Sequence, residues 1–306
     1  MGNSERNYYI ENGYILFKNL IAYEKIDHLL GEFEDFKNKG KVYYSQSHHN
    51  WRSCKTDIDN FGLLTCSIEN FTHLLWAKKL SKFGLNILLS DEINNCLKLI
   101  LNQDEFCMWQ NMLFDKSVGT VDHFDSWYLD TDPPGSLAGA WFALEDIDGK
   151  GGSFHIYPKS HKLDFSKTYS LDHDGFLHYS KQEIKKFNRY ELKLGKGDVL
   201  FWHPKLLHGS SLQDLDGYSR KSLTAHYFPV NYKKSLGGYK GINSNINDDA
   251  YTTDVKKQMQ YVSKYNYKIY TKKFRYTNID SIKGYMRYIT NYKNATHWLM
   301  NRQNYQ

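Results

Sequence analysis

Short strand-like segments fill the chain between residues 105 and 230, and they constrain its fold more than any other feature. Turns rich in glycine or proline divide them at 133–135, 149–152 and 195–197. Many short strands with no helical pattern between them are typical of a sandwich or barrel. We therefore predict a mainly β fold with flanking helices and a cupin-like jelly-roll core, also called a double-stranded β-helix. The predicted strands are Glu105–Phe114, Thr120–Trp127, Leu137–Leu144, Ser153–Tyr157, Tyr190–Leu194, Asp198–Trp202 and Ser222–Val230.

Residues 1–104 carry a different pattern, in which apolar residues recur at helical spacing. This part is expected to be a mostly helical support for the β core at 105–230. Polar residues 41–66 predict an irregular loop, in which the pair His48-His49 faces solvent. The predicted elements are a strand near Tyr14–Lys18 and helices over Tyr23–Phe36, over Asn70–Lys82 and from the N-cap Ser90 onward.

Residues 231–306 form a basic, tyrosine-rich segment. Fourteen Lys and Arg against four Asp and no Glu give it a charge of 14 − 4 = +10, so the rest of the chain carries +6 − 10 = −4. Spaced apolar residues such as Val255, Met259, Ile282 and Met286 predict helices that pack on the barrel. Two interpretations stay open: a positive surface that favours an anionic or carrier-linked substrate, or a helical cap with solvated lysines.

The tripeptide His123-Phe124-Asp125 is the first candidate site. Alternate residues of a β-strand point to the same face, so the His123 imidazole and the Asp125 carboxylate can converge. Such a pair is two thirds of a 2-His-1-carboxylate triad, which holds non-haem Fe(II) and leaves positions open for substrate and oxygen. A second stretch supplies His208 and Arg220, and a jelly roll can bring His208 to the same mouth.

Three other histidines compete for the third ligand position. His203 lies five residues before His208, so strand alternation places it on the other face. His161 lies in a loop and is expected to bond to the backbone. His226 lies in the last predicted strand and is expected to be structural.

The composition limits the class of protein and its compartment. A net charge of +6 is mild and gives no reason to expect a nucleic-acid partner. No apolar run is long enough to span a membrane and the N-terminal residues are polar, so we expect neither a transmembrane segment nor a secretory leader. The four cysteines form no C-x-x-C pair, which favours reduced thiols in the cytoplasm.

Taken together, these stretches resemble the phytanoyl-CoA dioxygenase family of Fe(II)/2-oxoglutarate-dependent oxygenases. Two departures stand out: position 159 is Lys where the family usually has Gly, and no family pattern matches after Pro229. The order and spacing of the motifs agree with the family as well as their residues. The resemblance covers Gly13 to Pro229 and rests on NGYILFKNLIAYEKIDHL, AWFALEDIDGKGGSFHIYPKSHK, GDVLFWHPKLLHGSS and RKSLTAHYFP.

The resemblance implies a role for each matching residue. His123, Asp125 and His208 would bind the iron. Arg220 would pair with the distal carboxylate of the cosubstrate 2-oxoglutarate, because a guanidinium can donate two parallel hydrogen bonds. Related halogenases have a small residue where Asp125 stands, which leaves room for halide, so the carboxylate implies hydroxylation, or less often desaturation.

Further residues are candidates for binding the small molecules. The resemblance implies that Ser210 adds a donor to the cosubstrate and that Trp141 lies beside it. A turn serine and a core tryptophan would explain these two positions equally well. Trp127, Tyr128 and His155 are candidate substrate contacts because they are polar or aromatic. His155 shares strand alternation with Ser153 and Tyr157 and could therefore face the pocket.

These roles predict a single oxygenase domain over residues 1–306 that uses Fe(II), 2-oxoglutarate and O2. It would hydroxylate a C–H bond of a small polar metabolite or a biosynthetic intermediate, such as a sugar-containing one, and release succinate and CO2. Two alternatives stay open: a non-catalytic jelly-roll binding protein, and a hydrolase or isomerase that holds Zn or Mn with the same ligands. The sequence leaves the oligomeric state open.

Overall fold

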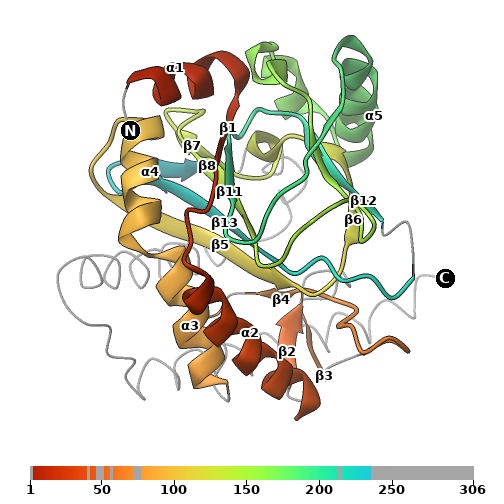
Figure 1. Ribbon diagram of the computed structural model, residues 1–306. Coiled ribbons are helices and arrows are strands. Elements are labelled where there is room, and N and C mark those ends of the chain that lie inside the picture. The colour runs from red at the N-terminus through yellow and green to blue at the C-terminus, as the bar shows by residue number, and fades with distance from the viewer. Residues whose placement is uncertain are drawn as a thin grey trace.

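Two antiparallel β-sheets form the centre of the protein (Figure 1). The computed structural model describes residues 3–39, 42–45, 52–55, 58–69, 71, 77–212 and 216–235. The larger sheet has the strand order β1 (Tyr14–Phe17), β11 (Val199–Trp202), β8 (Ala138–Ala143), β13 (Ser222–Pro229), β5 (Phe106–Phe114) and β4 (Ile68–Glu69). The smaller sheet has the order β10 (Tyr190–Glu191), β9 (Phe154–Ile156), β12 (His208–Leu212) and β6 (Val118–His123).

The two faces of the larger sheet belong to different hydrophobic cores. On β8, Ala140 and Phe142 pack in a core with helices α2 (Tyr23–Asn38), α3 (Lys78–Leu88) and α4 (Asp91–Leu101), which lie together on one side of the molecule (Figure 1). Trp141, between them in sequence, belongs to a second core with Phe154 and Ile156 of the smaller sheet. Because strand side chains alternate between faces, the second core lies between the two sheets, as in a jelly roll.

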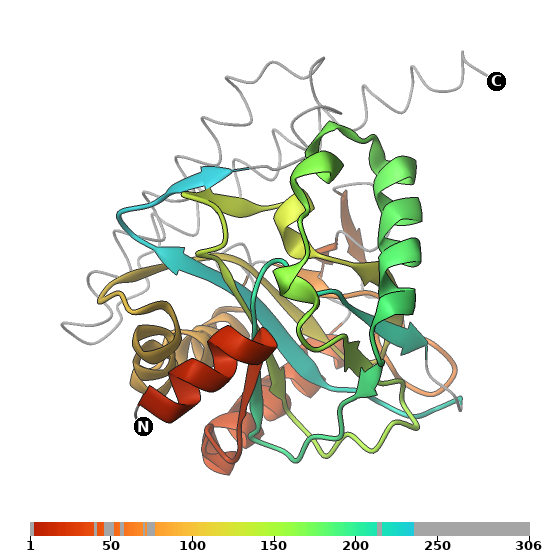
Figure 2. The ribbon, with the colours of Figure 1, turned by 90° about the horizontal axis from the view of Figure 1, so that it is seen from above.

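Shorter elements complete the fold. Helix α1 (Asn3–Asn12) precedes β1, and α5 (His173–Glu183) lies on the opposite side of the molecule (Figure 2). Asp172 caps α5 by accepting a hydrogen bond from the backbone N–H of Gly175 at 2.8 Å. The remaining pieces are the strand pairs β2 (Val42–Ser45) with β3 (Arg52–Lys55) and β7 (Asp130–Asp132) with β14 (Lys233–Ser235), and the 3-10 helices η2 (Asp125–Trp127), η3 (Ser160–Lys162), η4 (Ser166–Ser170) and η5 (Ile184–Lys186).

This architecture confirms the predicted fold class, and each of the seven predicted strands is present in a shorter form. Three expectations about secondary structure are wrong. Helix α5 lies between β9 and β10, where no helix was expected, because its buried face holds a single apolar side chain, Phe176. The polar stretch 41–66 contains the paired strands β2 and β3. The helix expected over Asn70–Lys82 is found as α3, at Lys78–Leu88.

Some predicted features lie outside the described residues. These are the His48-His49 pair and the helices of the basic segment beyond Ser235. The start of that segment, Lys233–Ser235, forms β14 and pairs with β7. The assignment of the whole chain to one oxygenase domain stays a prediction. Among the described helices, none combines the length and apolarity needed to cross a bilayer.

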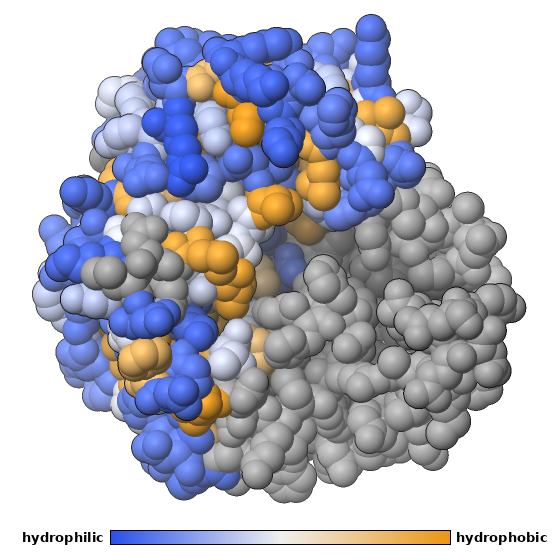
Figure 3. All heavy atoms as spheres, turned by 90° about the vertical axis from the view of Figure 1, so that its right-hand side faces the viewer, coloured by the Kyte–Doolittle hydropathy of each residue, from blue (hydrophilic) through white to orange (hydrophobic). Residues whose placement is uncertain are grey.

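One face of the molecule carries the exposed edge of the smaller sheet. Figure 3 looks onto this side, where hydrophobic side chains of the described residues border a hollow. Val121 on β6 and Leu212 on β12 are each 64% exposed here, which is unusual for large apolar residues in regular strands.

Candidate metal centre

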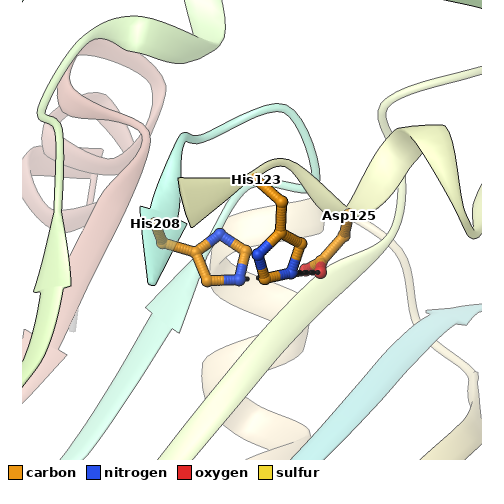
Figure 4. Close-up of side chains that lie close together, drawn as sticks. All are labelled: His123, Asp125 and His208. Carbon is orange, nitrogen blue, oxygen red and sulfur yellow. Dashed lines mark ion pairs between the residues drawn. The ribbon is translucent and has the colours of Figure 1, made fainter. Parts of the chain in front are cut away.

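Three side chains from distant parts of the chain converge on one point (Figure 4). His123 ends β6 and His208 begins β12, and the antiparallel register sets the two residues directly opposite each other. Asp125 reaches the same point from η2. The candidate ligand atoms of all three lie within 4.8 Å of one another, and no other such group is found in the described part of the chain. The fold thus brings together the three residues predicted to hold a metal.

Asp125 reaches this point for a different reason from the one expected. The predicted strand runs to residue 127, but β6 ends at His123. Alternation of side chains along a strand therefore does not explain why Asp125 points to the same place as His123. The chain turns instead: the Ser126 N–H donates to the Pro204 carbonyl at 2.9 Å, and the Tyr128 N–H donates to the Asp125 carbonyl at 2.8 Å. A turn anchored on the segment before β12 therefore aims the carboxylate at both imidazoles.

The backbone decides which nitrogen of each imidazole faces the centre. Nδ1 lies 2.8 Å from the Val121 carbonyl in His123 and 2.9 Å from the Leu206 carbonyl in His208. A carbonyl accepts only an N–H, so in the neutral ring the lone pair is on Nε2. These Nε2 atoms lie 3.5 Å and 3.6 Å from Oδ1 of Asp125, too far for strong hydrogen bonds.

The open atoms fit a divalent transition metal. Two imidazole nitrogens and one carboxylate oxygen are the donor set of the facial triad that binds Fe(II). The carbonyl partners of both Nδ1 atoms fix ring orientation, as hydrogen-bonded second nitrogens do in metal sites. The chemistry and direction of the donors therefore agree with an iron site.

Burial and neighbouring charges set the ionisation of the cluster. Burial lowers the pKa of His208 to about 4, so this ring is neutral near pH 7. Burial opposes ionisation of Asp125, but the adjacent His208 and His226 outweigh it and hold the pKa of the carboxyl well below its usual range. For His123, burial lowers the pKa, but the neighbouring negative charge of Asp125 outweighs it and raises the pKa of this ring. An anionic carboxylate beside a neutral imidazole favours a bound cation.

Arg220 lies in the interior without an anion to neutralise it. It is 3% exposed, and Nε and Nη1 have no hydrogen-bond partner among the described residues. Burial lowers the pKa of Arg220 to about 10. The guanidinium lies 5.5 Å from the ring centre of Trp141, which stacks on Phe154, and Phe154 stacks in turn on His208. A row of three rings therefore connects this cation to the metal cluster.

The structure places the two remaining cosubstrate candidates beside this row. Trp141 is 1% exposed in the core between the sheets, so it is both a core residue and the surface on which Arg220 rests. Ser210 is buried two residues after His208 on β12, opposite Phe154 of β9. Contact of either residue with a cosubstrate stays a prediction.

Trp127 and Tyr128 follow Asp125 in the chain, and only Tyr128 is partly exposed. Its ring packs edge-on against His123 at 5.7 Å, and its hydroxyl lies 3.0 Å from Nε2 of His173 on α5. Trp127 is fully buried, stacks on Phe176 at 4.5 Å and donates its indole N–H to the Thr168 carbonyl. We therefore correct the prediction for Trp127, which is a core residue that supports Tyr128.

His155 also requires a correction. Phe154 faces the metal cluster, so the next residue on β9 points to the opposite face of the sheet. There, Nε2 of His155 lies 2.5 Å from Oδ1 of Asp122, and this carboxylate also accepts a hydrogen bond from the Tyr157 hydroxyl. His155 thus joins strands behind the site and does not face a substrate.

Two residues at the centre were not singled out from the sequence. The Trp202 indole N–H donates to Oδ2 of Asp125 at 2.7 Å, and Nε2 of His226 lies 3.2 Å from the same oxygen. His226 was expected to be merely structural, and nothing in a single sequence links position 125 to positions 202 and 226. By contrast, His161 bonds to the Ile10 carbonyl at 2.9 Å, as expected.

Fold and site together define the class of protein: a jelly-roll protein with a two-histidine, one-carboxylate metal centre. The sequence profile of the phytanoyl-CoA dioxygenase (PhyH) family matches residues 9–213, more than half of the chain. The chain therefore belongs to the phytanoyl-CoA dioxygenase family. Membership confirms the predicted enzyme class, an Fe(II)/2-oxoglutarate-dependent dioxygenase.

Relatives of known name agree with this assignment. Peroxisomal phytanoyl-CoA dioxygenase of Bos taurus is 25% identical over 249 residues, which cover 74% of this chain and 68% of the relative. A probable phytanoyl-CoA dioxygenase of Caenorhabditis elegans is 22% identical over 238 residues, covering 73% and 74%. The profile match ends before Arg220, so the case for that residue rests on its environment.

Solved structures share the fold at low sequence identity. The carbocyclase SnoK from nogalamycin biosynthesis has a TM-score of 0.59 at 16% identity, covering 80% of this chain and 91% of that one. The epimerase SnoN, solved with Fe3+, alpha ketoglutarate and nogalamycin RO, has a TM-score of 0.56 at 16% identity, covering 75% and 84%. EctD from S. alaskensis, with 2-oxoglutarate and 5-hydroxyectoine, has a TM-score of 0.53 at 14% identity, covering 75% and 77%.

Proposed function

We propose that the protein hydroxylates a C–H bond of a small polar metabolite or biosynthetic intermediate and releases succinate and CO2. His123, Asp125 and His208 would hold Fe(II). Arg220, with Ser210 and Trp141 beside it, would hold 2-oxoglutarate. The bound iron would supply the activation of O2, with electrons from decarboxylation of the cosubstrate.

The observation that carries this proposal is the unpaired guanidinium of Arg220. A buried cation without an anion is strongly unfavourable, and no carboxylate of the described residues forms an ion pair with it. A dicarboxylate cosubstrate resolves this: one carboxylate pairs with Arg220 while the keto-acid end reaches toward the cluster. Zinc or manganese hydrolases and plain binding proteins would give this side chain no purpose.

The chain's own residues then have distinct tasks. The carbonyl groups at Val121 and Leu206 keep the Nε2 lone pairs of the two ligand histidines directed at the centre. Burial of Asp125 and Arg220 excludes water from both binding groups, which strengthens each electrostatic contact. The carboxylate of Asp125 occupies a coordination position that halide would need, so hydroxylation is the expected outcome.

Tyr128 is the candidate substrate contact that the geometry favours. Its ring borders His123, and its hydroxyl with His173 offers a donor and an acceptor on the side toward solvent. Such a pair suits hydroxyl or carbonyl groups of a polar substrate. An anionic or carrier-linked substrate attracted by the basic segment stays part of the proposal. So does a cytoplasmic location, which the buried cysteines Cys66, Cys96 and Cys107 support because none of them forms a disulfide in the described part of the chain.

Succinate release from 2-oxoglutarate separates this function from its alternatives. The purified protein is supplied anaerobically with Fe(II), then exposed to O2 and 2-oxoglutarate with panels of polar metabolites and sugar-containing intermediates. We expect succinate formation to increase when the true substrate is added, and we expect no succinate when Zn or Mn replaces Fe. Product formation with Zn or Mn and without 2-oxoglutarate would instead identify a hydrolase or isomerase.

A further inference from the structure

We propose that Trp202 and His226 are positioning residues that fix Asp125 so that only one of its oxygens binds the metal. The proposal rests on the metal centre assigned above. Both side chains contact the same oxygen, Oδ2, at 2.7 Å and 3.2 Å. They do not contact Oδ1, which faces the two ligand imidazoles (Figure 4).

The two donors use the whole binding capacity of Oδ2. Each oxygen of a carboxylate has two lone-pair sites, and here one receives the indole N–H and the other the imidazole N–H. Oδ1 keeps both of its sites, because the histidine Nε2 atoms carry lone pairs and donate nothing. The carboxylate thus presents one open oxygen to a cation. Bound through that oxygen alone, the carboxylate would take a single ligand position and leave the others to small molecules.

A glycine makes this arrangement possible. Gly139 of the central strand β8 pairs with Trp202 of β11 on one side and with His226 of β13 on the other. A Cβ at Gly139 would lie 2.1 Å from Cε2 and 2.6 Å from Nε1 of the indole, far inside van der Waals contact. The indole therefore crosses β8 over Gly139 and meets the His226 ring, 5.8 Å away, at the Asp125 carboxylate.

The contacts also join the two halves of the fold. Trp202 and His226 come from the larger sheet, whereas Asp125 follows β6 of the smaller sheet. Nδ1 of His226 is buried and has no hydrogen-bond partner among the described residues, so the contact of Nε2 with Asp125 fixes the orientation of this ring. Hydrogen bonds of this kind orient metal ligands, and their loss typically costs about 10–100-fold in metal affinity.

Fe(II) affinity under anaerobic conditions, measured by competition with a chromogenic chelator, tests the proposal without any substrate. Trp202→Phe removes the indole N–H and His226→Leu removes the imidazole N–H. His226→Gln restores a donor at nearly the same reach, and Gly139→Ala displaces the indole. We expect losses of about 10-fold or more for the Phe, Leu and Ala variants. The Gln variant is expected to stay within about threefold of the wild type, which a merely structural role would not predict.

Two controls make the result decisive. Tyr227→Phe removes an equally buried donor, a hydroxyl that bonds to the Leu88 carbonyl on the helical side of the larger sheet, and should leave Fe(II) affinity unchanged. His123→Ala should abolish binding. If His123→Ala binds Fe(II) like the wild type, the metal centre itself is wrongly assigned. If it loses Fe(II) while folded Trp202→Phe and His226→Leu, checked by thermal unfolding, keep it, the positioning role is overturned and the metal centre stands.

Discussion

The smaller sheet carries a histidine–aspartate grouping on each of its faces, and the two groupings differ in what they leave open. On the outer face, Nε2 of His155 lies 2.5 Å from Oδ1 of Asp122, and the Tyr157 hydroxyl donates to Oδ2. On the inner face, Nε2 of His123 and Nε2 of His208 lie 3.5–3.6 Å from Oδ1 of Asp125. The outer grouping is closed by its own hydrogen bonds, while the inner one keeps three unsatisfied ligand atoms.

The difference comes from the partners of each group rather than from residue type. Inside, backbone carbonyls engage Nδ1 of both histidines, and Trp202 with His226 engages the far oxygen of the carboxylate. Outside, Tyr157 also engages the far oxygen, but Nδ1 of His155 has no hydrogen-bond partner among the described residues, and Nε2 bonds directly to the aspartate. Identical side chains therefore form a metal centre on one face and a structural link on the other.

Two matched substitutions test the difference between the two faces. They are Asp125→Asn on the inner face and Asp122→Asn on the outer face. Asp125→Asn removes the anionic ligand, so we expect Fe(II) affinity and 2-oxoglutarate-dependent succinate formation to fall by more than about 100-fold. The loss of a residue that only hydrogen-bonds to a metal ligand already costs about 10–100-fold in metal affinity. The outer change should alter Fe(II) affinity by less than about threefold. Equal losses in chelator competition would show that both faces serve the metal.

Arg220→Lys tests the second open group on the inner side. Loss of a bidentate, charge-assisted contact costs about 2 kcal/mol, or about 30-fold in the apparent affinity for 2-oxoglutarate. Fe(II) affinity should not change. The matched control, Arg189→Lys, alters an arginine whose side chain is 40% exposed and which pairs with Glu191, and it should leave both affinities as they are. A wild-type response to 2-oxoglutarate in Arg220→Lys would place the anchor elsewhere.

His203 is a third type of histidine, partly buried and without a carboxylate partner among the described residues, and its effect on stability depends on pH. Burial lowers the pKa of His203 to about 3, against about 6.5 in an unfolded chain. Between these values the unfolded state binds the proton, so stability is lost as pH falls below about 6.5, by about 2 kcal/mol at pH 5.

His203→Asn should reduce this loss, since the amide oxygen can accept the Lys205 N–H and carries no titrating group. Urea unfolding at pH 7 and pH 5 measures the effect. An identical pH dependence in wild type and variant would assign the acid sensitivity to other groups.

The smallest effect is expected for the stability of Asp122→Asn. The bond to His155 is lost or weakened on a face where the aspartate side chain is 24% exposed, so unfolding free energy should fall by about 1 kcal/mol at pH 7. The hydrogen bonds of His155 and Tyr157 outweigh burial and lower the pKa of Asp122, so this contribution is present at neutral pH and disappears as acid protonates the carboxylate. Because this lowered pKa lies below the usual 3.8, thermal unfolding of the metal-free protein at pH 7 and pH 3 should show a smaller difference at pH 3.

The fold class and the three residues of the metal cluster could be predicted from the sequence. Glycine turns separate the strands, and a continuous apolar run predicts β8, whose residues are all buried. The small polar residues of β12 give no such pattern, so the strand that carries His208 escaped prediction. His208 itself was found through its place in the motif.

The orientation and the hydrogen-bond partners of the polar side chains became known from the three-dimensional fold alone. Asp125 belongs to a turn and not to a strand, and His155 points away from the site because Phe154 points toward it. Trp202 and His226 meet Asp125 across 77 and 101 residues of sequence, over a strand that is cleared by Gly139. Local sequence periodicity cannot encode such contacts, since they depend on which strands the two sheets bring together and in which register.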